Sequence, residues 1–183
     1  MLRKLCGRIL FNLLGFTVEE TIAKPNKYII ALAPHTSNWD FIIGQLFACA
    51  TGQRSHFLMK KEWFRGPLGP LMRSLGGVPV HRDKSTSRTD QIAEIARTRD
   101  TFCLCITPEG TRKLQPTWKR GFYYIALKAK IPILLYGLDY KKKRIVCTKS
   151  VMPTGDIDRE LPEIKRYFEQ FTARHPKKFT TGL

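Results

Sequence analysis

The chain has 183 residues, of which 43% are hydrophobic, 11% aromatic and 26% charged. At roughly 150 residues per domain this length predicts one folded domain, and the apolar content excludes a disordered or low-complexity chain. The formal net charge of +17, from 32 Lys and Arg against 15 Asp and Glu, predicts attraction to nucleic acid, anionic membranes, acidic carrier proteins or phosphorylated substrates.

Residues 1–16 predict an amphipathic helix. Arg3, Lys4, Arg8 and Asn12 fall on one side of it, and two interpretations of the apolar side stay open. The helix either packs on the core or lies in a membrane interface with its cations near anionic head groups. The apolar positions recur at three- and four-residue spacing: Leu2, Leu5, Cys6, Ile9, Leu10, Leu13 and Leu14.

Strands and helices alternate along the rest of the chain, without an internal repeat or linker. This alternation predicts an α/β fold with a largely parallel, mixed sheet flanked by helices, in one domain over residues 1–183. In such folds, ligands gather at the carboxyl ends of strands. The expected strands are 27–33, 56–59, 78–81, 101–106, 131–138 and 144–151, the last two forming a hairpin across the lysines at 141–143. The expected helices are 39–50, 89–97, 118–128 and one from a cap at Asp156 or Asp158 to about 173, with one or two helical turns between 62 and 75.

His35 and Asp40 follow the first of these strands, with Pro34 before them and Ser37 or Asn38 available as a helix cap between them. Five residues apart they could not meet on a regular helix, but they could meet across a helix start. Asp40 would then fix one imidazole nitrogen and leave the other facing outward as a base. The alternative is a histidine with only a structural role.

Cations and a flexible glycine mark three further strand ends. Thr107-Pro108-Glu109-Gly110-Thr111-Arg112 follows the strand 101–106: Gly110 permits a positive φ, Arg112 offers a planar fork suited to phosphate, and Glu109 can anchor an Arg or a hydroxyl. Arg82 ends the stretch that begins at Gly76, and Lys60 ends another strand. Each could also be an ordinary solvated surface residue.

In this order, the motifs resemble those of the glycerolipid acyltransferase family, which includes the lysophosphatidic acid acyltransferases, and of its short bacterial members in particular. His35 and Asp40 are similar to the family's H-x-x-x-x-D motif, 76–82 to its second motif, 108–112 to its third, and 130–133 to its fourth. The resemblance covers roughly residues 27 to 140.

The resemblance implies an acyltransferase fold and transfer of a fatty acyl group from coenzyme A or acyl carrier protein to a hydroxyl of a glycerol phosphate or lysophospholipid. A histidine with a pKa near 6.5 suits the removal of a hydroxyl proton. We therefore expect His35 as base and Asp40 orienting it. Arg112, with Arg82 and Lys60, would hold the acceptor phosphate, and Glu109 would position the acceptor or Arg112. The matched motif also places Gly110 and Thr111 at this binding site.

Two other function classes stay open. A thioesterase or lipid hydrolase could use the same His35 and Asp40 pair on water, and the charge alone would also suit a non-catalytic domain that binds nucleic acid or a membrane surface. No RNA-binding or zinc-finger pattern favours nucleic acid. No metal-ligand cluster or nucleotide loop indicates a cofactor, so the acyl thioester is the expected co-substrate.

The location expected from the sequence is the cytoplasm, on the inner face of the cell membrane. Five scattered cysteines without a C-x-x-C pair favour a reducing compartment. No run of about 18 apolar residues predicts a spanning helix, and the apolar stretch at 9–16 lacks the cleavage pattern of a secretory leader. The runs at 41–50 and 63–72 could line an acyl groove or touch the bilayer, or could simply pack in the core.

Overall fold

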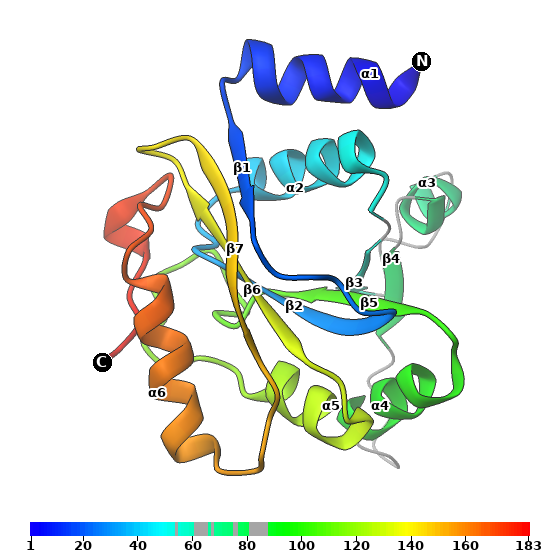
Figure 1. Cartoon of the computed structure of the whole chain (residues 1–183), viewed down its shortest axis with the longest axis vertical. Coiled ribbons are helices and arrows are strands. Elements are labelled where there is room, and N and C mark those ends of the chain that lie inside the picture. The colour runs from blue at the N-terminus through cyan, green and yellow to red at the C-terminus, as the bar shows by residue number, and fades with distance from the viewer. Residues whose placement is uncertain (54, 61–65, 67, 75–76, 81–87) are drawn as a thin grey trace.

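Seven strands form one mixed β-sheet at the centre of the molecule (Figure 1). In this computed structural model, residues 1–53, 55–60, 66, 68–74, 77–80 and 88–183 of the chain are described. The strands lie in the order β1-β7-β6-β2-β5-β3-β4. Their bounds are β1 Thr17–Glu20, β2 Lys27–Ala33, β3 His56–Lys60, β4 Gly77–Val80, β5 Phe102–Ile106, β6 Ile133–Asp139 and β7 Arg144–Val151.

Most of the sheet is parallel. β6, β2, β5, β3 and β4 run in one direction, whereas β7 turns back antiparallel to β6 and β1 pairs in parallel with β7 at the edge. The predicted α/β fold, with a largely parallel, mixed sheet and a hairpin at its end, is confirmed. Strand β1 was not predicted, because its four residues show a weak pattern and its partner lies near the other end of the chain.

Helices cover both faces of the sheet. The N-terminal helical segment and α2 lie on one face, and α4, α5 and α6 lie on the other (Figure 1). Their bounds are α1 Leu2–Gly7, continued by the π-helical η1 Arg8–Leu13, α2 Asn38–Thr51, α3 Leu68–Ser74, α4 Arg88–Thr98, α5 Gly121–Ala129, α6 Ile157–Phe168 and the short η3 Pro176–Lys178. None of the described helices is long and apolar enough to cross a bilayer.

Alternation along the buried strands explains why both faces carry helices. In β2, Ile29 and Ala31 point into the core beneath α4, α5 and α6, whereas Tyr28 and Ile30 point into the core beneath α2 and η1. Successive side chains of a strand point to opposite faces, so a strand that is apolar at successive positions, as β2 is from Tyr28 to Ala33, needs cover on both sides.

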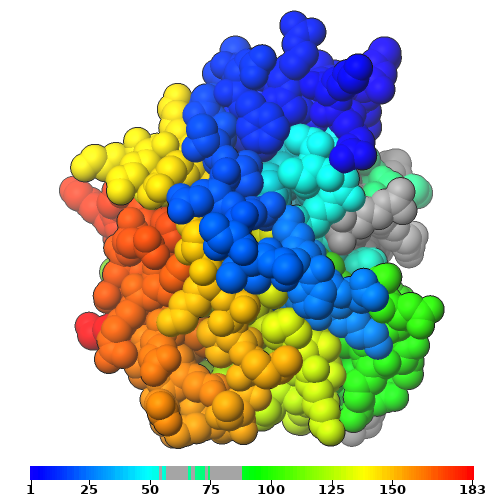
Figure 2. Space-filling model, in the orientation of Figure 1, coloured from blue at the N-terminus to red at the C-terminus, as the bar shows by residue number. Residues whose placement is uncertain are grey.

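The N-terminal helix is present, and its sides differ in burial. Cys6 and Leu10 are buried, and the Arg3 guanidinium donates to the carbonyl oxygen of Thr51 at the end of α2 over 2.8 Å. Figure 2 shows this N-terminal segment lying over α2. Leu5 and Leu13 remain 52% and 77% exposed. Core packing is therefore confirmed for the buried side, while a membrane role for the exposed side stays a prediction.

Two helices differ from their predicted bounds. The helix expected from Trp118 begins at Gly121, since the Trp118 indole donates to the carbonyl oxygen of Thr180 and its ring packs on Phe168. The last helix is capped by Asp156, as expected, but ends at Phe168 and not near 173. Of the turns expected between 62 and 75, α3 is seen at 68–74, and 61–65, 67 and 75 lie outside the described residues.

The C-terminal segment is fitted closely against β6. Phe171 lies on the backbone of Gly137, where an added Cβ would stand 2.1 Å from the ring. The amide of Tyr140 then donates to the carbonyl oxygen of Thr172 over 2.9 Å. These contacts hold the residues after α6 beside the carboxyl end of β6.

Candidate active site

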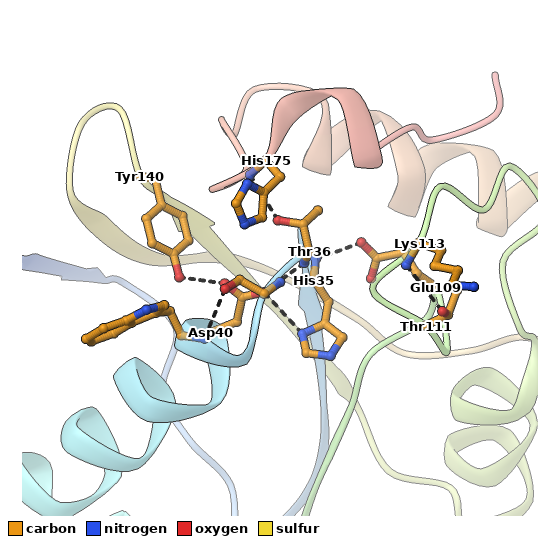
Figure 3. A network of polar contacts seen from close by, with 10 residues as sticks. His35, Thr36, Asp40, Glu109, Thr111, Lys113, Tyr140 and His175 are labelled. Atoms are coloured by element: carbon orange, nitrogen blue, oxygen red, sulfur yellow. Dashed lines mark hydrogen bonds and ion pairs between the residues drawn. The ribbon is translucent and has the colours of Figure 1, made fainter.

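Three loops meet where β2, β5 and β6 end. The register pairs Ala31 with Ile106 and Ala33 with Gly137, so the carboxyl ends of these parallel strands lie side by side. The loop after β2 carries His35, the loop after β5 carries Glu109, and the turn after β6 begins with Tyr140. Figure 3 shows Tyr140 and Glu109 on opposite sides of the His35 and Asp40 pair.

A capping box forms the start of α2 and places Asp40. Ser37 has extended backbone angles, and its hydroxyl oxygen accepts from the amide of Trp39 over 3.2 Å. The Asp40 Oδ2 atom accepts from the amides of Thr36 and Ser37 over 2.8 and 2.9 Å. The sequence Ser-Asn-Trp-Asp thus satisfies the first amides of the helix locally and turns the carboxylate back toward the loop.

His35 and Asp40 meet across this helix start, as expected. The His35 Nδ1 atom lies 3.2 Å from Asp40 Oδ2, with the imidazole 20% exposed and the carboxylate fully buried. The contact is at ion-pair distance but outside hydrogen-bond geometry. Nε2 is left on the far side of the ring (Figure 3). A neutral imidazole held in this way has its second nitrogen free to take a proton.

The surroundings of Asp40 keep it ionised. Burial alone would raise the pKa of Asp40, but the contacts with His35 and Tyr140 and two backbone amides outweigh burial and hold this pKa below its ordinary value. The Tyr140 hydroxyl donates to Asp40 Oδ1 over 2.5 Å. A buried carboxylate with this many donors stays charged at neutral pH, and its charge favours an imidazolium beside it.

Glu109 holds the backbone of the histidine loop. Its Oε1 atom accepts from the amide of His35 over 2.8 Å, and the residue is 3% exposed. Its Oε2 atom is buried without a described hydrogen-bond partner. Burial raises the pKa of Glu109 to about 7, against the smaller lowering effect of the contact with His35. Glu109 therefore lies beside His35, beneath the surface.

The rest of the loop after Glu109 is exposed and partly ordered by local contacts. Gly110 has φ +66°, the positive angle expected for it, and an added Cβ would lie 3.1 Å from the Lys119 side chain. The Thr111 hydroxyl accepts from the amide of Lys113 over 3.2 Å, and Arg112 is exposed. Arg112 can therefore reach an anion in solution from the same loop that carries Glu109.

Two cations expected at the site cannot be placed beside it. Lys60 is the last residue of β3, but only its backbone is described. Arg82 lies outside the described residues. Within the part of the chain that is described, no group of three or more His, Cys, Asp or Glu side chains is arranged to hold a metal ion.

Residues of the C-terminal half complete the site and were not predicted from the sequence. Besides Tyr140, the amide of His175 donates to the Thr36 hydroxyl over 3.2 Å, and the Arg174 guanidinium lies 5.1 Å from the Trp39 ring and 5.7 Å from the Tyr140 ring. One signal could have found Tyr140: it directly follows a buried strand, at the edge where ligands gather.

A small apolar cavity of about 90 Å³ lies under α2, with Asp40 in its wall. Its lining comes from the inner side of α2 and from the sheet beneath. Ile43 and Phe47 of the predicted run 41–50 are buried in the core, while Phe41 and Ile42 are about 40% exposed. The run thus packs in the core and also borders the cavity.

Similarities to known proteins indicate the family of this chain. A family model described as Acyltransferase matches residues 15–135. The chain is 30% identical over 188 residues to 1-acyl-sn-glycerol-3-phosphate acyltransferase from Cocos nucifera. The matched region spans 91% of this chain but only 59% of the length of that protein. The fold is similar to the crystal structure of the 1-acyl-sn-glycerophosphate (LPA) acyltransferase PlsC from Thermotoga maritima, with a TM-score of 0.63, 20% identity, and coverage of 92% of this chain and 76% of that one.

The family match includes the residues that meet at the strand ends. His35, Asp40 and the loop from Glu109 to Arg112 all lie within residues 15–135, a segment that makes up well over half of the chain. The order of motifs, the fold and the family match agree. The chain belongs to the acyltransferase family.

Proposed function

We propose that this protein transfers a fatty acyl group from an acyl thioester, acyl-CoA or acyl-ACP, to a hydroxyl of a lysophospholipid or glycerol phosphate. Lysophosphatidic acid is the favoured acceptor and phosphatidic acid the product, since the relative from Cocos nucifera carries 1-acylglycerol-3-phosphate in its name. The observation that carries the proposal is the imidazole of His35, partly exposed and held 3.2 Å from the buried Asp40 carboxylate.

In the proposed reaction, Nε2 of His35 removes the proton of the acceptor hydroxyl as its oxygen attacks the thioester carbonyl carbon. A carbon–oxygen bond forms, the carbonyl becomes a tetrahedral oxyanion, and the imidazolium is stabilised by Asp40. The intermediate then collapses with cleavage of the carbon–sulfur bond, and the imidazolium returns its proton to the leaving thiolate. No enzyme nucleophile is consumed, because the acceptor itself attacks.

The acceptor phosphate is assigned to the cations of the loops. Arg112 is exposed beside Glu109, and its guanidinium can bind phosphate in a bidentate manner. Lys60 and Arg82 remain proposed partners of this phosphate. The burial of Glu109 and its hydrogen bond to the His35 amide favour a role in setting the position of the base.

Two features suit a lipid substrate. The apolar cavity under α2 offers an acyl chain an apolar surface that reaches Asp40, the partner of His35. The N-terminal segment exposes Leu5 and Leu13 beside Arg3 and Arg8, a pattern typical of interfacial binding to anionic membranes. We therefore assign the protein to the membrane surface that faces the cytoplasm.

Purified protein, mixed with a long-chain acyl thioester, tests the assignment through thiol release with and without lysophosphatidic acid. Release that depends on the acceptor is expected. Release without acceptor would instead indicate a hydrolase, and no release with any lysolipid would indicate a binding protein.

The first prediction is that His35→Ala lowers turnover by roughly 10²-fold to 10⁴-fold, the usual contribution of a positioned base. His56→Ala is the matched control, because His56 lies at the start of β3 and its ring contacts the carbonyl oxygen of Cys103. We expect this control to keep the rate of the unsubstituted protein. A His35→Ala protein that is folded and equally fast would contradict the mechanism.

A further inference from the structure

We propose that Tyr140 is a positioning residue of the His35 and Asp40 pair: its hydroxyl fixes which carboxylate oxygen faces the imidazole and moderates how strongly that imidazole holds a proton. The proposal rests on the proposed function in one respect, the role of His35 as base. Tyr140 lies outside residues 15–135, the segment matched by the family model.

The two oxygens of Asp40 have separate partners. Oδ2 accepts from the amides of Thr36 and Ser37 and faces His35. Oδ1 accepts from the Tyr140 hydroxyl over 2.5 Å. Because the Asp40 side chain is fully buried, loss of the Tyr140 donor would leave Oδ1 short of a protein hydrogen-bond donor, at a cost typical of an unsatisfied charged group.

Tyr140 is itself held in place from three directions. Its ring packs edge-on against Phe16 with 5.9 Å between centroids. Its amide donates to the carbonyl oxygen of Thr172, and the Arg174 guanidinium lies 5.7 Å from the ring. The first two contacts do not use the hydroxyl, so the ring and backbone stay supported when phenylalanine replaces Tyr140. The hydroxyl also interacts with Arg174, so the replacement removes this interaction together with the hydrogen bond to Asp40.

Other groups that can carry a charge lie beside the His35 and Asp40 pair. Burial, together with the Asp40 charge, raises the pKa of the Tyr140 hydroxyl, so Tyr140 remains a neutral donor over the working pH range. Glu109, from the loop after β5, has a pKa of about 7 and faces the backbone of His35. Arg174, from the C-terminal segment, lies over the Tyr140 ring. Both of these groups remain in a Tyr140 variant, and Arg174 loses its interaction with the hydroxyl.

The sign of the effect follows from the hydrogen bond. The Tyr140 donor disperses part of the negative charge of Asp40, and without it the carboxylate becomes more basic and binds a neighbouring imidazolium more strongly. His35 would then keep its proton to a higher pH. A base that is protonated over more of the pH range works only at higher pH, so the acidic limb of the rate profile moves upward.

The second prediction concerns Tyr140→Phe, tested with kcat/KM against pH and with an NMR titration of the ¹⁵N-labelled imidazole of His35. The chain has four histidines, and the spectrum of His35→Ala identifies the His35 signals. We expect the acidic limb and the His35 titration both to move upward by about 0.5 to 1 pH unit. At pH 7 we expect kcat/KM to fall roughly 10-fold, because the base is less available and less well oriented.

Tyr123→Phe is the matched control. Tyr123 is fully buried in α5, and its hydroxyl donates to the Glu160 carboxylate over 2.6 Å, away from the strand ends. This variant loses the same kind of tyrosine-to-carboxylate hydrogen bond, together with the one that the Tyr123 hydroxyl accepts from the Gly155 amide. It therefore reports the effect of lost stability away from His35. A fluorinated tyrosine at position 140 keeps the ring and makes the hydroxyl a stronger donor, so the acidic limb should move downward.

Three results separate the possibilities. Opposite movements of the limb in Tyr140→Phe and in the fluorinated protein, with no movement in Tyr123→Phe, support the role. An unchanged His35 titration in Tyr140→Phe, or an equal movement in the Tyr123 control, overturns it. If His35→Ala remains active while the titration still depends on Tyr140, the proposed function fails and the link from tyrosine through carboxylate to imidazole stands.

Discussion

Two carboxyl groups lie on either side of His35 and differ in protonation. The Asp40 carboxylate accepts hydrogen bonds at both oxygens, which hold its pKa below the ordinary value. Glu109 accepts one hydrogen bond at Oε1, and burial raises its pKa to about 7. Only the first is therefore a fixed negative charge near neutrality. The number of donors at each carboxyl group thus decides which one carries a negative charge beside His35.

The third prediction follows from the raised pKa of Glu109. A group that binds its proton more tightly in the folded state stabilises the fold fully below its unfolded pKa of about 4.5, and this stabilisation is lost as the pH rises through about 7. Between pH 5 and pH 8, the protein should lose about 2 to 3 kcal/mol of unfolding free energy through this group.

Glu109→Gln should remove that part of the pH dependence, because the amide does not titrate and can still accept from the His35 amide. Urea unfolding at pH 5 and pH 8 measures the change in unfolding free energy of the unsubstituted protein and of Glu109→Gln. The contribution of Asp40 is the same in both proteins and cancels in the comparison. Equal pH dependence in the two proteins would show that Glu109 does not titrate in this range.

At the scale of elements, the start of α2 and the N-terminal segment show what local sequence can predict. The order of Ser37 and Asp40 is enough to form the capping box, because both of its partners lie within one turn. The sides of the N-terminal helix follow equally from its spacing. Which side is buried depends on α2, however, and Leu10 is buried while Leu13 is 77% exposed.

The fourth prediction is that the double variant Leu5→Ser, Leu13→Ser binds anionic vesicles roughly 10-fold to 30-fold more weakly. Each of the two exposed leucines would contribute about 1 kcal/mol to binding by burying its side chain in the membrane interface. Deletion of residues 1–16 is a poorer test, because Leu10 and Phe16 belong to the core. Met152→Ser is the control: Met152 is 57% exposed, beyond the end of β7. If the double variant sediments with vesicles as the unsubstituted protein does, the N-terminal segment has a purely structural role.

At the scale of the whole molecule, the fold could be predicted further than the site. Runs such as 27–33 and 131–138 indicated strands because nearly all of their positions are apolar, and the strand-end rule brought His35 and Glu109 to one edge. The contacts of Tyr140 with Asp40 and of His175 with Thr36 join positions 100 and 139 residues apart. No local pattern encodes such pairs, because they arise only when the C-terminal segment packs against β6.

The fifth prediction concerns the distribution of charge over the molecule. The lysine turn at 141–143 lies beside the N-terminal segment: the amide of Thr17 donates to the carbonyl oxygen of Lys143, and the Lys143 ammonium lies 3.5 Å from a Cβ placed at Gly15. Basic groups far apart in sequence thus share one surface. Raising NaCl from 0.1 to 1 M, which shortens the Debye length from about 10 Å to 3 Å, should release the protein from anionic vesicles.

Vesicles of zwitterionic lipid provide the control, because they lack the surface charge that salt screens. We expect little binding to them at either salt concentration. Binding to anionic vesicles that survives 1 M NaCl would show that apolar insertion outweighs charge.

The lack of a side chain at Gly137 affects residues well beyond β6. Phe171 occupies the volume that any side chain there would fill, so even alanine would lift the ring and shift the chain that follows it. The shifted segment includes Thr172, whose carbonyl oxygen accepts from the Tyr140 amide, and His175, whose amide donates to the Thr36 hydroxyl. The absence of a side chain at Gly137 therefore sets how the C-terminal segment packs against the loop that carries His35.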